Sequence, residues 1–145
     1  MKKETVFQRY EFKYLLTRGQ QARLLSAAGA RLRPDEYSHS SIRNLYLDTP
    51  DFRLIRRSLE KPVYKEKLRL RSYGVPREMD NVFLEVKKKV RGVVYKRRIC
   101  LPLAQAMECL AQGSVPAAGG QIGREIAYML RRYRLRPAVL LAYDR

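Results

Sequence analysis

Polar and apolar residues alternate with a period of two through much of the chain. Such alternation predicts β-strands, because successive side chains of a strand point to opposite faces of a sheet. Apolar residues with helical spacing, such as Leu25, Ala28 and Leu32, predict helices between the strands. The pattern predicts six strands, at residues 9–16, 42–48, 64–73, 82–89, 93–101 and 138–145. It predicts four helices, at residues 18–32, 51–59, 102–112 and 122–133.

Boundary residues support these elements. Thr17 stands three residues before Gln20, which is the spacing of a capping box at a helix start. Arg91 and Gly92 separate two strands in the manner of a tight hairpin turn. Because several strands follow one another in hairpin-like order, we expect an α+β fold with an antiparallel sheet, as one domain over residues 1–145.

The alternation places cations on one face of four predicted strands and mostly apolar residues on the other. In the strand at 64–73, for example, Lys67 and Arg69 share a face opposite Leu68. Among the residues of these faces are nine cations and two carboxylates: Arg9, Lys13, Lys65, Lys67, Arg69, Arg71, Lys87, Lys96 and Arg98, with Glu11 and Glu85. Each strand alone fits a solvated sheet face. The combined excess fits that interpretation less well, because like charges on neighbouring strands repel, and a bound polyanion would supply the countercharge.

Composition narrows the candidate partners only in part. The 145 residues include 31 Lys and Arg against 14 Asp and Glu, a net charge of +17, which suits nucleic acid, an anionic membrane or a phosphate-rich ligand. We expect no membrane span and no signal peptide, because no long apolar run is present, and we therefore expect a cytoplasmic protein. The two cysteines, Cys100 and Cys109, lack the CxxC spacing of a zinc site.

Ten tyrosines raise the alternative of a non-enzymatic nucleic-acid-binding module, because tyrosine rings can stack on bases. However, Tyr10, Tyr14 and Tyr95 fall on strand faces opposite the cations, where they look like core residues. RNA-binding sheets instead place aromatic and cationic side chains on the same surface. We therefore do not expect nucleic acid as the partner.

The two carboxylates among the cations have two interpretations. Glu11 and Glu85 could hold a divalent metal ion that bridges phosphate oxygens. Alternatively, they neutralise and orient their neighbours Lys13 and Lys87. The strand pattern alone is compatible with both.

Six segments of the chain carry a resemblance to a known family. In chain order they are RYEFKY at 9–14, LYLDTPD at 45–51, KLRLRSYG at 67–74, FLEVK at 83–87, VYKRR at 94–98 and YDR at 143–145. In this order they resemble the N-terminal part of the VTC domain, the polyphosphate polymerase domain of the triphosphate-tunnel (CYTH) superfamily. The match extends over nearly the whole chain.

The resemblance implies an antiparallel sheet that curls into a β-tunnel with flanking helices. Its interior would bind ATP, or another triphosphate, and inorganic polyphosphate, and the domain would transfer the γ-phosphate of ATP to the polyphosphate chain with Mn²⁺ or Mg²⁺. No protein nucleophile is implied. The implied phosphate ligands are Lys13, Lys67, Arg69, Arg71, Lys87, Lys96, Arg98 and Arg145.

Two departures from the family pattern shape the expectation. Triphosphatases of the superfamily usually open with ExExK, whereas position 9 here is Arg, which favours the VTC branch over a tunnel-type triphosphatase or cyclase. The family's domain also continues well past the position that corresponds to Arg145. We therefore expect an incomplete tunnel, with a second chain as one candidate to complete it.

Overall fold

The computed structural model describes residues 6–9, 14–33 and 40–144. Its described strands form one six-stranded sheet in the order β1-β5-β4-β3-β2-β6, and every neighbouring pair is antiparallel. The strands are β1 (Val6–Arg9), β2 (Ser41–Asp48), β3 (Tyr64–Tyr73), β4 (Asn81–Val90), β5 (Val93–Pro102) and β6 (Arg136–Asp144). The helices are α1 (Arg18–Ala28), α2 (Arg53–Leu59), α3 (Leu103–Gln112) and α4 (Gly120–Tyr133), with short 3-10 turns at Gly29–Arg31 and Ala117–Gly119.

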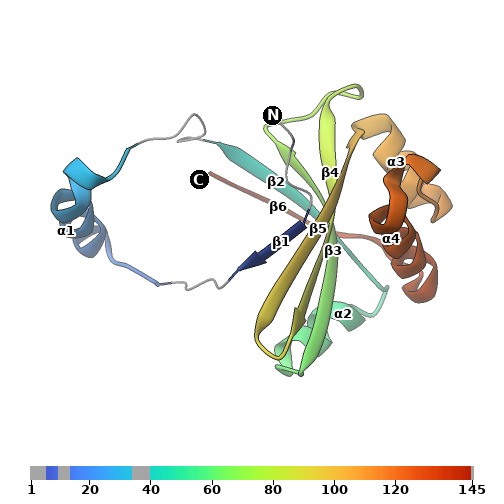
Figure 1. The fold of residues 1–145 in the computed structure, drawn as a ribbon, viewed down its shortest axis with the longest axis horizontal. Helices are drawn as coiled ribbons and strands as arrows, with labels where there is room; N and C mark the ends of the chain where they lie inside the picture. The colour runs from blue at the N-terminus through green and yellow to red at the C-terminus, as the bar shows by residue number, and fades with distance from the viewer. Residues whose placement is uncertain (1–5, 10–13, 34–39, 145) are drawn as a thin grey trace.

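The helices do not cover the two faces of the sheet equally. Figure 1 shows a strongly twisted sheet with α3 and α4 together on one side, α2 near one end, and α1 apart from the rest. None of the residues of α1 is buried, although Thr17 and Gln20 form the predicted capping box. Within the described ranges, none of the helices is long and apolar enough to cross a membrane.

The core lies between the sheet and the α3–α4 layer. Leu68, Leu84 and Val86 point to this side from β3 and β4, and they belong to one buried cluster with Ile126 and Met129 of α4. Burial of such side chains contributes roughly 1.5–3 kcal/mol each. On β3, β4 and β5, the residues that alternate with these core positions therefore point to the other face of the sheet. The helices α3 and α4 leave that face uncovered.

The predicted central hairpin is confirmed. Arg91 and Gly92 both have positive φ, at 46° and 88°, which matches the right-handed twist of a two-residue hairpin turn. The turn joins β4 to β5 and sets their register, in which Glu85 lies opposite Arg98. Of the predicted elements, β2 to β5 agree with the structure to within one residue at each end.

The predicted first strand is wrong in its position. It was expected at residues 9–16, whereas β1 covers Val6–Arg9 and Tyr14 has no regular structure. Arg9 pairs with Val94 of β5, and residues 10–13 of the predicted strand lie outside the described residues.

The α+β class and the antiparallel sheet are confirmed, and the described sheet is open. Its two edges are β1 and β6, which do not pair with each other in the described part of the chain. Every residue of β6 is exposed, including Val139, Leu140, Leu141 and Tyr143. An apolar edge strand with an unpaired side is a surface on which another strand can add.

Candidate anion-binding site

Three central strands bring their cations side by side. On the uncovered face, Lys67 lies opposite Lys87, and Lys87 lies opposite Lys96, so one lysine from each of β3, β4 and β5 forms a row across the sheet. The next row contains Arg69, Glu85 and Arg98. We call the face formed by these six residues the cationic face. Directly opposed like charges destabilise a sheet, so such rows need a source of negative charge.

Glu85 provides that charge at the centre of the cationic face. Its side chain is only 1% exposed. Arg69 donates from Nε to Oε2 at 2.8 Å and approaches the same oxygen with Nη2 at 2.7 Å, while Lys96 Nζ lies 2.8 Å from Oε1. Arg71 and Arg98 approach Glu85 more loosely, at 3.8 and 3.9 Å. Four cations therefore share one carboxylate, a local excess of three positive charges.

The crowding of charges around Glu85 shifts the pKa values of Glu85 and Lys96. Burial works to raise the pKa of Glu85, but Arg69, Lys96 and Arg71 outweigh it and hold the pKa below its ordinary value. Burial lowers the pKa of Lys96, and the nearby Arg71 and Arg98 add to that effect, so that even contact with Glu85 does not compensate. The cations of this cluster are therefore under mutual repulsion that an additional anion would relieve.

Side chains outside the predicted set hold the arginines in place. Arg69 donates from Nη1 to the hydroxyl of Tyr46 at 3.1 Å, and Arg98 lies over the ring of Phe83 at 4.6 Å. Arg71 donates from Nε to Asn44 Oδ1 at 2.8 Å. Asn44 is 1% exposed, and its Nδ2 has no hydrogen-bond partner within the described residues. The cluster thus contains a buried donor that still lacks an acceptor.

Comparison with known proteins shows the family of the chain. The family model for the VTC domain matches residues 8–145. The chain belongs to the VTC domain family. A candidate adenylate cyclase from Bacillus halodurans, known from its crystal structure, has a similar fold, with a TM-score of 0.56 at 19% sequence identity. That match covers 98% of this chain and 64% of the other chain. None of the curated proteins matches significantly.

The VTC domain therefore spans about two thirds of the length of that structural neighbour. The shared α+β fold, with its open antiparallel sheet, is consistent with a tunnel fold. At this level of identity the likeness concerns the fold alone.

The structure gathers six of the predicted phosphate ligands on one face of the VTC domain. They are Lys67, Arg69, Arg71, Lys87, Lys96 and Arg98. Lys13 and Arg145 lie outside the described residues. Phosphate binding by these eight residues stays a prediction.

The described residues alone do not fit a divalent metal. Glu85 is the carboxylate at the cluster, and its oxygens face arginine and lysine nitrogens. A hard cation prefers several oxygen ligands, and the described part of the chain contains no group of three His, Cys, Asp or Glu side chains suited to a metal. The other predicted ligand, Glu11, lies outside the described residues. The contacts of Glu85 resemble the neutralising alternative, with Arg69 and Lys96 as its nearest partners in place of Lys87.

The tyrosine argument against nucleic acid needs correction. Tyr14 is 81% exposed and Tyr95 is also exposed, so neither is a core residue. Tyr46 and Phe83, in contrast, lie on the cationic face beside arginines. Phe83 is buried, and the guanidinium of Arg69 lies 5.8 Å from the centre of the Tyr46 ring.

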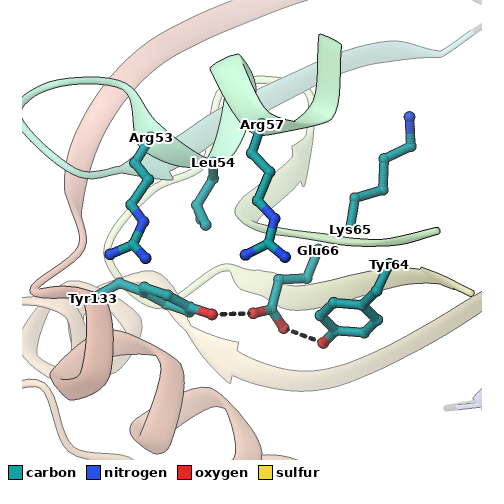
Figure 2. A pocket seen from close by; sticks show the side chains of 7 residues that line it. All are labelled: Arg53, Leu54, Arg57, Tyr64, Lys65, Glu66 and Tyr133. Carbon is teal, nitrogen blue, oxygen red and sulfur yellow. Dashed lines mark hydrogen bonds between the residues drawn. The ribbon is translucent and has the colours of Figure 1, made fainter. Parts of the chain in front are cut away.

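On the face that α3 and α4 cover, the carboxylates have different partners. Glu66 accepts hydrogen bonds from the hydroxyls of Tyr64 and Tyr133, both at 2.6 Å, and Figure 2 shows this arrangement at the floor of a pocket below α2. Glu125 of α4 pairs with Lys88 at 3.3 Å and with Arg97. These contacts join α4 to β3, β4 and β5, which is a structural role.

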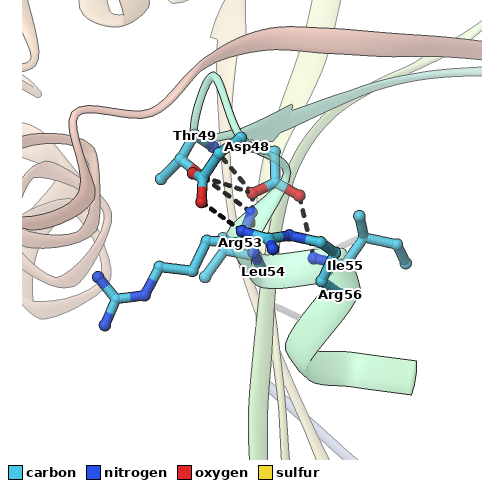
Figure 3. A network of polar contacts seen from close by, with 7 residues as sticks. Asp48, Thr49, Arg53, Leu54, Ile55 and Arg56 are labelled. Atoms are coloured by element: carbon cyan, nitrogen blue, oxygen red, sulfur yellow. Dashed lines mark hydrogen bonds and ion pairs between the residues drawn. The ribbon is translucent and has the colours of Figure 1, made fainter. Parts of the chain in front are cut away.

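Asp48 also has a structural role, at the turn between β2 and α2. Its Oδ1 accepts from the backbone N–H groups of Thr49 and Leu54, and its Oδ2 accepts from Ile55 N–H at 3.0 Å. Figure 3 shows this carboxylate turned toward the start of α2. It satisfies N–H groups that the first turn of a helix leaves unpaired. Asp48 therefore fixes the turn between β2 and α2.

Proposed function

We propose that this VTC domain binds ATP and inorganic polyphosphate on its cationic face and transfers the γ-phosphate of ATP to the polyphosphate chain. The observation that carries the proposal is the single buried carboxylate shared by four cations, next to a row of three lysines. Arginine offers forked donors that match phosphate oxygens, and lysine offers a compact charge. A linear chain of phosphates provides many negative charges for such an array.

The spacing of the cations suits an extended anion. Alternate residues of a strand stand roughly 6.6 Å apart, and neighbouring strands are about 4.8 Å apart. Lys67, Arg69 and Arg71 follow one strand, and the lysine row crosses it. Several phosphate groups of one ligand can therefore contact different cations at once, whereas a single small anion reaches only a few.

The residues of the cationic face could promote phosphoryl transfer by neutralising charge and aligning the reacting oxygens. Phosphoryl transfer depends largely on such positioning and electrostatic stabilisation, so that no protein nucleophile is needed. Partial burial of Arg69 and Lys96 strengthens their interaction with an anion by lowering the local dielectric. The dependence on Mn²⁺ or Mg²⁺ remains a prediction that the activity assay below also tests.

The exposed edge of β6 supports a second part of the proposal. Further strands, from a second chain or from a longer polypeptide, would pair with β6 and bring more cations toward the same ligand. The apolar exposure of Leu140 and Leu141 favours such an addition. A cytoplasmic location, where ATP is abundant, stays part of this proposal.

Thermal unfolding with and without tripolyphosphate is the first test, at fixed ionic strength and with sulfate as the control. At a hundredfold excess over Kd, a ligand that binds only the folded state adds about 2.7 kcal/mol of stability, on the order of 5–10 °C for a chain of this size. We expect this shift with tripolyphosphate and little shift with sulfate. Equal small shifts would indicate diffuse charge and would contradict the proposal.

Lys67→Gln and Arg124→Gln form a matched pair for this test. Both remove one positive charge, but Lys67 lies on the cationic face and Arg124 is exposed on α4. We expect Lys67→Gln to weaken tripolyphosphate binding roughly five- to tenfold, equivalent to about 1–1.4 kcal/mol. Arg124→Gln should leave binding nearly unchanged. Equal losses in both variants would mean that net charge alone governs binding.

Product analysis separates the proposed transferase from a cyclase or triphosphatase. The fold of the candidate adenylate cyclase favours a cyclase as the second candidate function. Incubation with ATP, polyphosphate primer and Mn²⁺ or Mg²⁺ should lengthen the polyphosphate and release ADP. Formation of cyclic AMP and pyrophosphate, or of free phosphate without chain growth, would identify the alternatives.

A further inference from the structure

Glu85 and Glu125 both pair with lysine and arginine side chains of the sheet, but they do so on opposite faces of it. Glu125 pairs with Lys88 and Arg97 on the face that α4 covers, and its side chain remains partly exposed. Glu85 lies on the cationic face, is almost completely buried, and has twice as many cations around it. The two residues therefore allow a direct comparison of the same chemical group in two settings.

Glu85 occupies several of the donors of Arg69 and Lys96 that a phosphate group could use. The guanidinium of Arg69 turns Nε and Nη2 toward Oε2, and its remaining Nη1 donates to Tyr46. Lys96 lies against Oε1. A phosphate that binds these cations has to share them with Glu85 or replace it, because a donor N–H directed at one oxygen is not available to a second one at full strength.

The cations would not keep this arrangement without a negative charge among them. Arg69 and Arg98 flank Glu85 on the two neighbouring strands, and Arg71 approaches it from the next position along β3. Like charges at this separation repel strongly where the surroundings exclude water. Glu85 therefore stabilises the ligand-free site, and it also opposes the approach of another anion.

We propose that Glu85 is a positioning residue that acts as an internal counter-ion: it holds Arg69 and Lys96 in place without ligand, is displaced from them by a phosphate chain, and thereby sets the affinity of the site. This inference rests on the proposed function, since it assumes that phosphate binds the cationic face. It assigns Glu85 a role that differs from that of a metal ligand.

The proposal predicts opposite effects of Glu85→Gln on the two states of the protein. The amide has nearly the same size but no charge, so the ligand-free variant loses the counter-ion and melts at a lower temperature. In the bound state the phosphates supply the missing charge. Tripolyphosphate should therefore bind about tenfold more tightly to Glu85→Gln than to the wild type, since a nearby like charge is removed.

The experiment compares the wild type, Glu85→Gln and Glu125→Gln by thermal unfolding over a tripolyphosphate titration at fixed ionic strength. Glu125→Gln changes the net charge equally and also removes an ion-paired carboxylate, but on the opposite face. We expect a larger tripolyphosphate-induced rise in melting temperature for Glu85→Gln than for the wild type. Glu125→Gln should show the wild-type rise from a lower starting temperature.

A second readout separates the counter-ion from a metal ligand. The titration is repeated with Mn²⁺, and the proposal expects the same effect of Mn²⁺ on tripolyphosphate binding in the wild type and in Glu85→Gln. A loss of the Mn²⁺ effect only in Glu85→Gln would overturn the proposal and identify Glu85 as a metal ligand.

The remaining outcomes also decide the question. An equal or smaller rise in Glu85→Gln, with a normal wild-type response, overturns the counter-ion proposal and leaves the proposed function standing. No response in the wild type contradicts both. If Glu85→Gln is unfolded without ligand, recovery of a cooperative transition with tripolyphosphate but not with sulfate supports the proposal, whereas failure to recover at saturating tripolyphosphate contradicts it.

Discussion

On the face covered by α3 and α4, Glu66 is held by two tyrosine hydroxyls and Glu125 by two cations, whereas on the uncovered face Glu85 is shared by four cations. The same three strands carry both arrangements. On the covered face, acceptors and donors are balanced within the chain, as expected where the role is to join layers. On the cationic face positive charge is in excess, as expected where the balancing charge comes from a ligand.

The largest effect should come from the covered face, because it contains the core. Ile126→Ala removes a fully buried side chain of α4 and should lower the free energy of unfolding by about 2–5 kcal/mol, measured by urea unfolding. Tyr128→Ala, at an exposed position of the same helix, is the control and should change stability by less than about 1 kcal/mol.

The comparison between faces adds a second requirement for Ile126→Ala. At a temperature where the variant is folded, its affinity for tripolyphosphate should equal that of the wild type, because the helix layer does not contact the cationic face. If the variant lost its affinity while remaining folded, the two faces would be coupled and their separate roles would have to be abandoned.

Sequence reasoning predicted the faces better than the contacts within them. The alternation of Lys67, Leu68 and Arg69 placed cations and core residues on opposite sides, and the structure agrees. The partners of Glu85 could not be predicted, because they depend on the register between strands. A period of two places Glu85 and Lys87 on one face, but only the pairing of β4 with β3 and β5 brings Arg69 and Lys96 to Glu85.

Asn44 and Tyr46 were missed for a related reason. The alternation in β2 places both on one face, and the sequence pattern does not say which face of the sheet this is. Pairing of Asn44 with Arg71 and of Tyr46 with Arg69 in the ladder places them on the cationic face.

An intermediate effect is expected at the turn that joins β2 to α2. Asp48→Asn replaces an oxygen that accepts from Ile55 N–H by an amide donor, or forces the amide to flip against Thr49 and Leu54. A buried donor left without an acceptor costs about 1–3 kcal/mol, so urea unfolding should show a loss of that size. Asp51→Asn, at an exposed neighbouring position, is the matched control and should have little effect. Comparable losses in both variants would show that Asp48 is not the main cap of α2.

The smallest effect on stability is expected at Tyr133, which contacts Glu66 on the covered face. Tyr133→Phe removes one of the two hydroxyl donors of Glu66 and keeps the ring that packs beside Arg53. Because Glu66 retains Tyr64 as a donor, we expect a loss of about 0.5–1.5 kcal/mol in urea unfolding, and Tyr128→Phe should cause no change. Tripolyphosphate should raise the melting temperature of Tyr133→Phe by the wild-type amount, since Glu66 balances its own donors and holds no cation of the cationic face. A weakened tripolyphosphate response would instead place the Glu66 pocket within the ligand site.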